Sequence, residues 1–246
     1  CTRAVELLEG QSPRPQASLL RARRSLGLAL VSAGELDRAG QLIDETLVQG
    51  RALFGDAHPD NLGLMELLAT IRARRGRMGE AVTMGFAAVA GFESVVGPTN
   101  IRTANARLNL GVLLLEAGRP VEAEAMLGEA VVRFQEGGVG GRSLAMAQHD
   151  HALTLVTLGQ LDRARDAEAA AIVTLESAEG PDARGLGHLH GGLGRVEVAA
   201  GRRAAALRAY ARARTLFTQH DDTAGMQQIN EELAQMNAAD SPSPSD

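Results

Sequence analysis

The chain has 246 residues, of which 45% are apolar and only 2% are aromatic, and its formal net charge is -5. This charge lacks the basic excess that drives nucleic-acid binding through counterion release, and few rings are present for base stacking, so we expect no nucleic-acid partner. All 25 basic residues are arginine, which excludes mechanisms that need lysine as a nucleophile or as a phosphate ligand.

Cysteine content and hydropathy bear on the cellular compartment of the protein and on its cofactors and membrane partners. Cys1 is the only cysteine, so an internal disulfide and a thiolate metal cage are both excluded. We therefore expect a cytoplasmic protein without a cofactor. No stretch of sequence approaches the roughly 18 consecutive apolar residues of a membrane-spanning helix, so we also expect no membrane partner.

Two small residues recur along the chain at a fixed period. Glycine followed five residues later by alanine occurs at Gly34/Ala39, Gly76/Ala81, Gly118/Ala123, Gly159/Ala164 and Gly201/Ala206, with glycine spacings of 42, 42, 41 and 42 residues. Small residues on facing stripes let antiparallel helices approach closely, and the glycine between them can end the first helix tightly. Each period is therefore predicted to be a helical hairpin, and the fold class to be all-α.

A second set of turn signals lies between the hairpins, as in Gly55-Asp56-Ala57-His58-Pro59-Asp60 and Gly97-Pro98-Thr99-Asn100. Glycine and proline end one helix there, and Asp, Thr or Ser is expected to cap the next. In chain order, we predict the end of a truncated repeat at 1–9, repeats at 17–54, 59–96, 100–136, 142–178 and 183–219, a capping helix at 222–238 and a disordered tail at 239–246.

The two ends follow from the same period. One period before Thr46 lies Ala4, in register with the small residues of later repeats, so we expect the chain to begin inside a repeat and to be a fragment. At the other end, an apolar stripe is predicted to cover the last hairpin. It consists of Met226, Ile229, Leu233 and Met236.

This pattern resembles the tetratricopeptide family, whose hairpins carry Leu-Gly in the first helix, Gly at the turn and Ala in the second helix. The 42-residue spacing, residues 55–60 and Leu108-Asn109-Leu110-Gly111 are similar to the kinesin-light-chain subclass. Glu168 departs from the pattern, because a bulky apolar residue is expected at its position. The resemblance implies a right-handed superhelix of helical hairpins that binds proteins or peptides and has no enzymatic activity.

Candidate ligand contacts are the polar residues of the first helices that lie off the packing stripe, because these helices line the groove in such an architecture. They are Arg21, Arg24, Glu66, Thr70, Arg74, Asn105, Asn109, Glu116, His149, Asp150, His188 and Arg195. The family resemblance supports Asn109 most directly, because an Asn at that place contacts the backbone of bound peptide. An amide suits this task since it both donates and accepts hydrogen bonds.

Three alternatives stay open. Similar repeats occur as accessory segments of bacterial regulators, so the chain could be the C-terminal regulatory or sensor segment of a serine/threonine kinase or transcriptional regulator. His149-Asp150-His151, with His188 and His190 one repeat later, suggests a histidine-based metal hydrolase. However, residues two apart on a helix point about 200° apart, so His149 and His151 cannot face one metal. The third alternative is self-association through the repeat ends.

Overall fold

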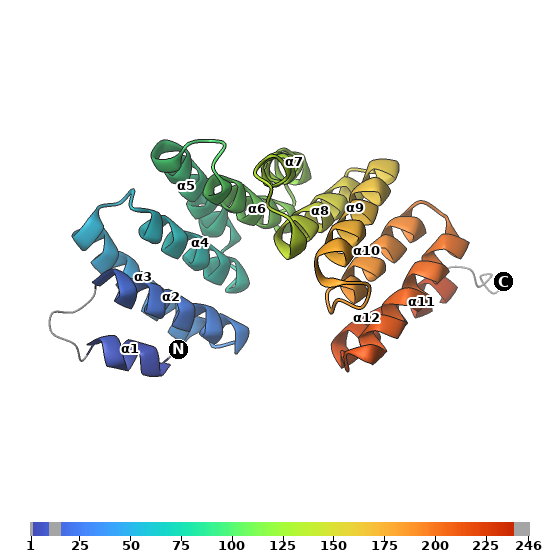
Figure 1. The fold of residues 1–246 in the computed structure, drawn as a ribbon, viewed down its shortest axis with the longest axis horizontal. Coiled ribbons are helices and arrows are strands. Elements are labelled where there is room, and N and C mark those ends of the chain that lie inside the picture. Colours follow the sequence, from blue (N-terminus) through green and yellow to red (C-terminus); the bar gives the residue numbers. More distant parts are fainter. Residues whose placement is uncertain (1, 10–15, 239–246) are drawn as a thin grey trace, which may run out of the picture. The chain divides into compact units, whose positions relative to one another are not determined.

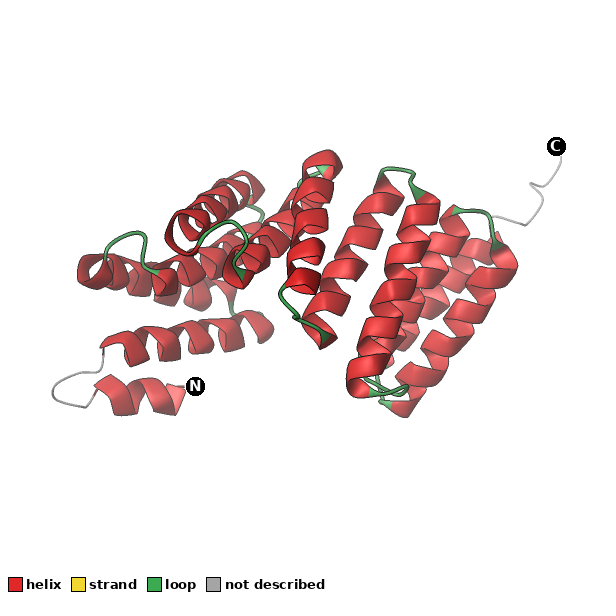
Figure 2. Cartoon of the chain, turned by 45° about the horizontal axis from the view of Figure 1, so that its top comes forward, coloured by secondary structure: helices red, strands yellow, loops and turns green. Residues whose placement is uncertain are grey.

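The structure is a computed structural model that describes residues 2–9 and 16–238, and its described part consists of helices joined by loops (Figure 2). The tail predicted at 239–246 lies outside the described residues. The helices, labelled in Figure 1, are α1 (Thr2–Glu9), α2 (Gln16–Ser32), α3 (Leu36–Phe54), α4 (Pro59–Arg74), α5 (Met78–Val96), α6 (Ile101–Glu116), α7 (Pro120–Glu136), α8 (Gly141–Thr157), α9 (Leu161–Glu179), α10 (Leu186–Ala199), α11 (Arg203–Gln219) and α12 (Thr223–Ala238). The predicted all-α class is confirmed.

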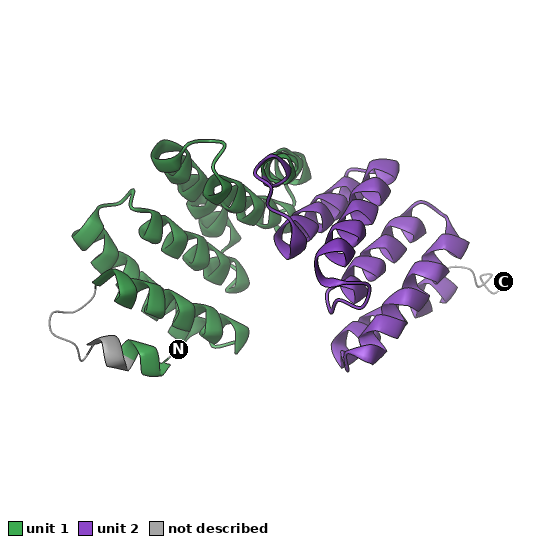
Figure 3. Cartoon of the chain, in the orientation of Figure 1, with its two compact units in different colours: residues 1–133 green, residues 134–246 purple. Residues whose placement is uncertain are grey.

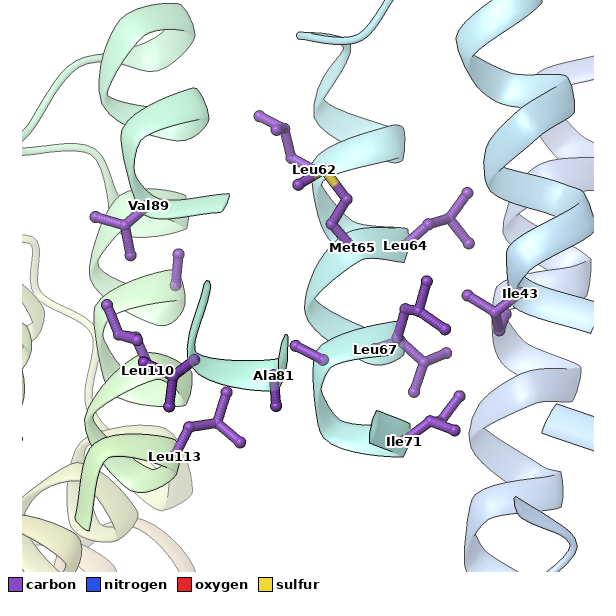
Figure 4. Close-up of a cluster of buried hydrophobic side chains, with 14 of the residues drawn as sticks. Ile43, Leu62, Leu64, Met65, Leu67, Ile71, Ala81, Val89, Leu110 and Leu113 are labelled. Atoms are coloured by element: carbon purple, nitrogen blue, oxygen red, sulfur yellow. The ribbon is translucent and has the colours of Figure 1, made fainter. Parts of the chain in front are cut away.

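The chain divides into two compact units, residues 1–133 and 134–246 (Figure 3). In the first unit, consecutive helices from α1 to α6 pack on one another, and α4 also contacts α2 and α6. Buried apolar side chains from these helices form its core, of which Figure 4 shows a part around Leu67 and Leu110. In the second unit, α10 contacts α8, α9, α11 and α12.

The glycines at the predicted turns have the backbone conformation expected of them. Gly34, Gly76, Gly118, Gly159 and Gly201 have φ between +70° and +79°, a left-handed region in which residues with a Cβ are strained. Gly55, Gly97 and Gly180 end α3, α5 and α9 with φ of +82°, +91° and +91°. The prediction that glycine ends the helices is confirmed at these positions.

The caps of two first helices differ from the expectation. The side chain of His58 accepts a hydrogen bond from the backbone N–H of Asp60, and Asn100 accepts one from the N–H of Arg102. The expected capping types were Asp, Thr or Ser. Asn is an equally good acceptor at this position, and the Nδ1 atom of His58, 3.2 Å from the Asp60 nitrogen, serves the same purpose.

In three of the five hairpins, a glycine on the first helix faces a large residue on the second. A Cβ atom on Gly27 would lie 2.6 Å from Ile43 Cδ1, and one on Gly111 would lie 2.5 Å from Leu127 Cγ. Gly194 is related to Tyr210 in the same way. Such distances are shorter than real Cβ contacts, so the absent side chain is what lets the helices approach this closely.

Two buried polar side chains fasten successive hairpins in the first unit. Asn61 Nδ2 donates to the carbonyl of Gly55 at 2.7 Å, and Thr103 Oγ1 donates to the carbonyl of Gly97 at 2.7 Å. Both carbonyls belong to glycines that follow the end of a helix, where backbone acceptors lack intrahelical partners. Each contact therefore ties the start of a first helix to the end of the preceding helix.

Helix α5 is more apolar than the sequence pattern indicated. In the described part of the chain, Met78–Val96 is the one helix long and apolar enough, by length and composition, to be compared with a membrane span, and 33% of it is buried inside the structure. Its buried residues include Ala81, Ala88 and Phe92, and the helix packs against α4 and α6. Core packing thus accounts for one face of this helix.

The last helix carries the predicted apolar stripe. Ile229 and Met236 of α12 are buried with Tyr210 and Phe217 of α11. Met226 and Leu233 pack against the same cluster. The four apolar residues of the predicted stripe therefore share one core with α11, as expected of a helix that covers the final hairpin.

Candidate functional site

In the first unit, three predicted ligand contacts lie next to one another on successive first helices. Asn109 Nδ2 on α6 donates to Glu66 Oε1 on α4 at 2.8 Å. The Arg24 guanidinium on α2 packs over Gly63, where a Cβ would lie 3.3 Å from Arg24 Cζ. We call Arg24, Glu66 and Asn109 the polar row. The structure thus brings together residues that are about 42 positions apart in the sequence.

The electrostatics of the polar row centre on Glu66. Burial raises the pKa of the Glu66 carboxyl, while the hydrogen bond from Asn109 and the charge of Arg24 act in the opposite direction. Arg24 and Asn109 are themselves exposed. A partly buried carboxylate therefore orients two exposed groups, one cationic and one amide.

The other predicted contacts of the first unit do not join this row. Arg21, Thr70 and Asn105 each donate to a backbone carbonyl four residues earlier on their own helix. Arg74 reaches from α4 to the carbonyl of Val31 at 2.9 Å. Glu116 is exposed near the end of α6.

In the second unit, three of the four predicted contacts line one pocket of about 280 Å³, which we call the α8/α10/α12 pocket. Its lining consists of His149, His188, Gly191, Arg195, Phe217, Gln228 and Ile229. Asp150, the fourth predicted contact, is not part of this lining.

A buried carboxylate anchors the first of these histidines. His149 Nδ1 lies 2.8 Å from Glu168 Oε1 and 3.0 Å from Oε2, and the Glu168 side chain is fully buried. Gly192 makes room for the pair, because a Cβ there would lie 2.8 Å from His149 Cε1 and closer still to Glu168. The ring is thus held through Nδ1.

The pKa values of Glu168 and His149 are both raised in the folded chain. Burial raises the pKa of Glu168, and the hydrogen bond and charge of His149 offset this in part. Burial lowers the pKa of His149, but the hydrogen bond and negative charge of Glu168 outweigh it, so that the His149 pKa is raised. A proton on this pair is therefore bound more firmly in the folded chain.

Carboxylates stand behind the other polar groups of the pocket as well. Arg195 Nη1 lies 3.1 Å from Glu232 Oε1, and Gln228 Nε2 donates to the same oxygen at 3.0 Å. His188 Nε2 lies 3.4 Å from Asp222 Oδ2, and its ring meets Phe217 edge-on with centroids 4.9 Å apart. The nitrogen-bearing side chains that line the pocket are therefore each paired with a carboxylate.

The histidines do not gather as the metal-hydrolase alternative requires. His149 and His188 line one pocket, but Asp150 does not accompany them. His190 lines a different pocket with Leu193, Arg208 and Arg212. Among the described side chains of residues 2–5 and 16–238, no three His, Cys, Asp or Glu groups converge in a way that could hold a metal ion.

Comparison with known proteins identifies the repeat. Residues 60–136 match the family model of the tetratricopeptide repeat. The fold of the chain is also similar to the crystal structure of a kinesin light chain from Podosopora anserina with nearly identical TPR-like repeats, at a TM-score of 0.69 and 18% identity, covering 82% of this chain and 96% of that one. Residues 60–136 therefore belong to the tetratricopeptide-repeat family, and the chain has the fold of tetratricopeptide-repeat structures.

Two further structures share the tetratricopeptide fold. BtubC (BKLC) from P. vanneervenii has a TM-score of 0.74 and 22% identity, and the match covers 89% of each chain. The Rap conjugation gene regulator of the plasmid pLS20, in complex with the Phr* peptide, has a TM-score of 0.68 and 13% identity, covering 89% of this chain and 59% of that one. At these identities the likeness shows the fold alone, so the kinesin-light-chain subclass stays a prediction. No curated protein matches the sequence.

The tetratricopeptide fold is that of a protein–protein interaction module, and such repeats are in general non-enzymatic scaffolds. Within it, sequence reasoning missed four lining residues of the α8/α10/α12 pocket. Gly191, Phe217, Gln228 and Ile229 come from α10, α11 and α12. Glu168 was the available signal, because a carboxylate at an apolar tetratricopeptide position needs a polar partner. That partner, His149, borders the pocket.

Proposed function

We propose that the chain binds a peptide or protein partner through the first helices of its repeats, with the polar row of Arg24, Glu66 and Asn109 as a principal contact. The observation that carries this proposal is the hydrogen bond from Asn109 to Glu66. It orients an exposed amide on the helix face that, in this type of repeat, meets ligands.

The chemistry of an amide explains why this arrangement suits a polypeptide. An Asn side chain has two N–H donors and an acceptor oxygen, and the contact with Glu66 uses one donor. The same amide can still pair with the backbone of an extended peptide, whatever the side chains of that peptide are. Arg24 adds a cation beside it, which favours peptides with an acidic residue nearby.

Two further points belong to the same proposal. The similar Rap regulator was solved in complex with a peptide, which supports a peptide as the partner and agrees with a regulatory role for this chain. We place the chain in the cytoplasm and assign it no catalytic activity, in line with its single cysteine and its scaffold fold. A larger bacterial kinase or transcriptional regulator would be a suitable host for such a segment.

The test is selection of peptides from a random display library on the immobilised chain, followed by affinity measurement with fluorescently labelled peptides. Asn109→Ala is expected to weaken the selected peptides about tenfold or more, as the loss of a hydrogen bond in a partly buried contact implies. The matched control is Gln41→Ala, which removes another amide–carboxylate pair, Gln41 Nε2 to Glu45 Oε1 at 3.2 Å, from the second helix α3. Equal affinities for the wild type and Asn109→Ala would refute the proposal.

A further inference from the structure

The α8/α10/α12 pocket is lined by cationic and polar side chains. Its polar walls are His149, His188, Arg195 and Gln228, and no acidic residue is among the lining residues. In a chain with a net charge of -5, a pocket with this composition runs against the average charge of the protein.

The carboxylates of this region lie deeper than the nitrogen groups that they bind. The Glu168 side chain is 0% exposed whereas that of His149 is 18% exposed, and Glu232 is 17% exposed whereas Arg195 is 32% exposed. Asp222 and His188 show the same order, at 23% and 55%. Because Coulomb energy falls with distance, a group in the pocket experiences the nearer nitrogen atoms more strongly than the carboxylates behind them.

The backing acids also fix the directions of the donors. With Nδ1 of His149 held by Glu168, the Nε2 atom is the ring nitrogen left to face a ligand, and in the protonated ring it donates a hydrogen bond. Arg195 uses Nη1 for Glu232, and a guanidinium has five N–H donors in a rigid fork. Preorganised donors of this kind favour an acceptor with two or more oxygen atoms.

The remaining lining sets the size of the ligand group. Phe217 and Ile229 give the pocket an apolar wall, and a side chain on Gly191 would meet Ile229 Cδ1 at 3.1 Å. The volume of about 280 Å³ suits a small terminal group and its first carbon atoms, rather than a folded segment.

We propose that the α8/α10/α12 pocket is a binding site for an oxyanion group, in which Arg195 and His149 donate hydrogen bonds to carboxylate or phosphate oxygens. The site lies wholly in the second unit, so it is independent of the polar row in the first. His188 and Gln228 flank the group, and Phe217 contacts its carbon atoms.

The probe is acetate, titrated into the full chain and followed by NMR of the backbone and imidazole resonances at constant ionic strength. Saturable changes at His149 and Arg195 are expected with acetate and not with acetamide, which has the same shape without the charge. An equal response to acetamide would overturn the proposal.

The source of the oxyanion is distinguished by three further probes. Inorganic phosphate that binds more tightly than acetate assigns the pocket to a phosphate group. Acetylglycine that binds more tightly than acetyl-aspartate amide assigns it to a chain terminus, and the reverse order assigns it to an acidic side chain. Absence of saturable binding by all of these probes would contradict the assignment.

Arg195→Gln is expected to weaken acetate binding about tenfold or more, because a charged hydrogen bond is lost. Arg142→Gln is the matched control, since Arg142 also pairs with a glutamate of the second unit, Glu179 at 2.6 Å, outside the pocket. If circular dichroism shows that Arg195→Gln is unfolded, Arg195→Lys keeps a cation beside Glu232 but removes the fork, and weaker acetate binding is expected again. Unchanged binding in a folded Arg195 variant would refute the site, whereas Asn109→Ala should leave acetate binding intact.

Discussion

Leu127 occupies the space that a side chain on Gly111 would need, since a Cβ there would lie 2.5 Å from Leu127 Cγ. We expect Gly111→Ala to lower the free energy of unfolding of the first unit by about 1 to 3 kcal/mol, because a fully buried leucine has to move. In the double variant with Leu127→Ala, the two effects should not add, because the new methyl group enters the space that the leucine leaves. Urea unfolding followed by circular dichroism measures this.

Gly79→Ala is the control for that experiment. Gly79 lies in α5, and a Cβ there would have nothing within 4 Å. The helix propensity of alanine should therefore raise stability by about 0.5 to 1 kcal/mol. A loss at Gly79 as large as that at Gly111 would show that steric contact is not the cause.

The turn glycine Gly118 should tolerate substitution poorly for a different reason. Its φ is +72°, and a Cβ there would meet no atom within 4 Å, so backbone strain acts alone. Gly118→Ala should lower the free energy of unfolding by about 1 to 2 kcal/mol. Gly118→Asn should lower it less, because Asn tolerates this region better. Equal losses in the two variants would contradict this explanation, and urea midpoints decide between them.

The pair of His149 and Glu168 should make the stability of the second unit depend on pH. Both pKa values are raised in the folded chain from ordinary values of 6.5 and 4.5, so the folded chain binds more protons than the unfolded one. The free energy of unfolding should therefore fall as pH rises, from 4.5 upward for Glu168 and from 6.5 upward for His149. Thermal unfolding between pH 4.5 and 9 in wild type and Glu168→Gln measures it.

In Glu168→Gln, the titrating acid and the charge that raises the His149 pKa are both removed. The decline of stability with rising pH should therefore flatten. Glu176→Gln, on the same helix and only partly buried, is the comparison variant and should keep the decline of the wild type. An unchanged slope in Glu168→Gln would show that other groups are responsible.

His190 should act in the opposite direction. Burial and the charge of Arg212 lower its pKa from 6.5 to about 4, so the folded chain binds fewer protons than the unfolded one in this interval. The free energy of unfolding should fall as pH drops from 6.5 toward 4. Because the ring is partly exposed, we expect an effect on the order of 1 kcal/mol.

His190→Met introduces the residue type of Met65, which holds the corresponding position before the turn glycine of an earlier repeat. This variant should remove the loss at low pH and raise the melting temperature more at pH 5 than at pH 8. His190 Nε2 is also buried without a hydrogen-bond partner among the described residues, which adds to the gain. His220→Gln, in the same unit, should not reproduce the pattern. An equal rise in melting temperature at both pH values would show that packing, and not the titration of His190, causes the gain.

The contact between Thr103 and the carbonyl of Gly97 should be worth more than an exposed threonine contact. Thr103→Val keeps the shape but leaves the carbonyl of Gly97 without its hydroxyl donor, so we expect a loss of about 1 to 3 kcal/mol in urea unfolding. Thr83→Val removes an exposed contact to Gly79 within α5 and should change stability by less than about 0.5 kcal/mol. Similar losses of unfolding free energy in both variants would show that the contact of Thr103 does not stabilise the junction between hairpins.

The hairpins and their turns could be predicted because their causes are local. Glycine at positions such as Gly76 and Gly118 is required by its own backbone conformation, and the 42-residue period repeats that requirement. Helix existence followed from the same period. The break between units after Arg133 could not be predicted, since the period continues across it with a change of a single residue.

The pocket of the second unit was harder to predict because its contacts are distant in sequence. His149, His188 and Arg195 were candidates as exposed polar residues, but Gln228 is on the capping helix, where only the apolar stripe was recognised. The sequence shows that Glu168 is out of place among apolar residues. Which group it pairs with depends on the space left by Gly192, and that is a property of the packed helices.

The pairing of small and large residues has a consequence for how such a protein can be rearranged. The hairpin with Gly111 and Leu127 satisfies this steric demand internally, whereas a Cβ on Gly27 would also meet Leu67 of the following hairpin at 3.2 Å and one on Gly85 would meet Leu110 of the following hairpin. Transplanting or deleting units would therefore succeed most readily for self-contained hairpins. A duplication that separates Gly85 from Leu110 would leave a void on one side of the new junction. In evolution and in engineering, those two hairpins would therefore have to be moved together as one segment.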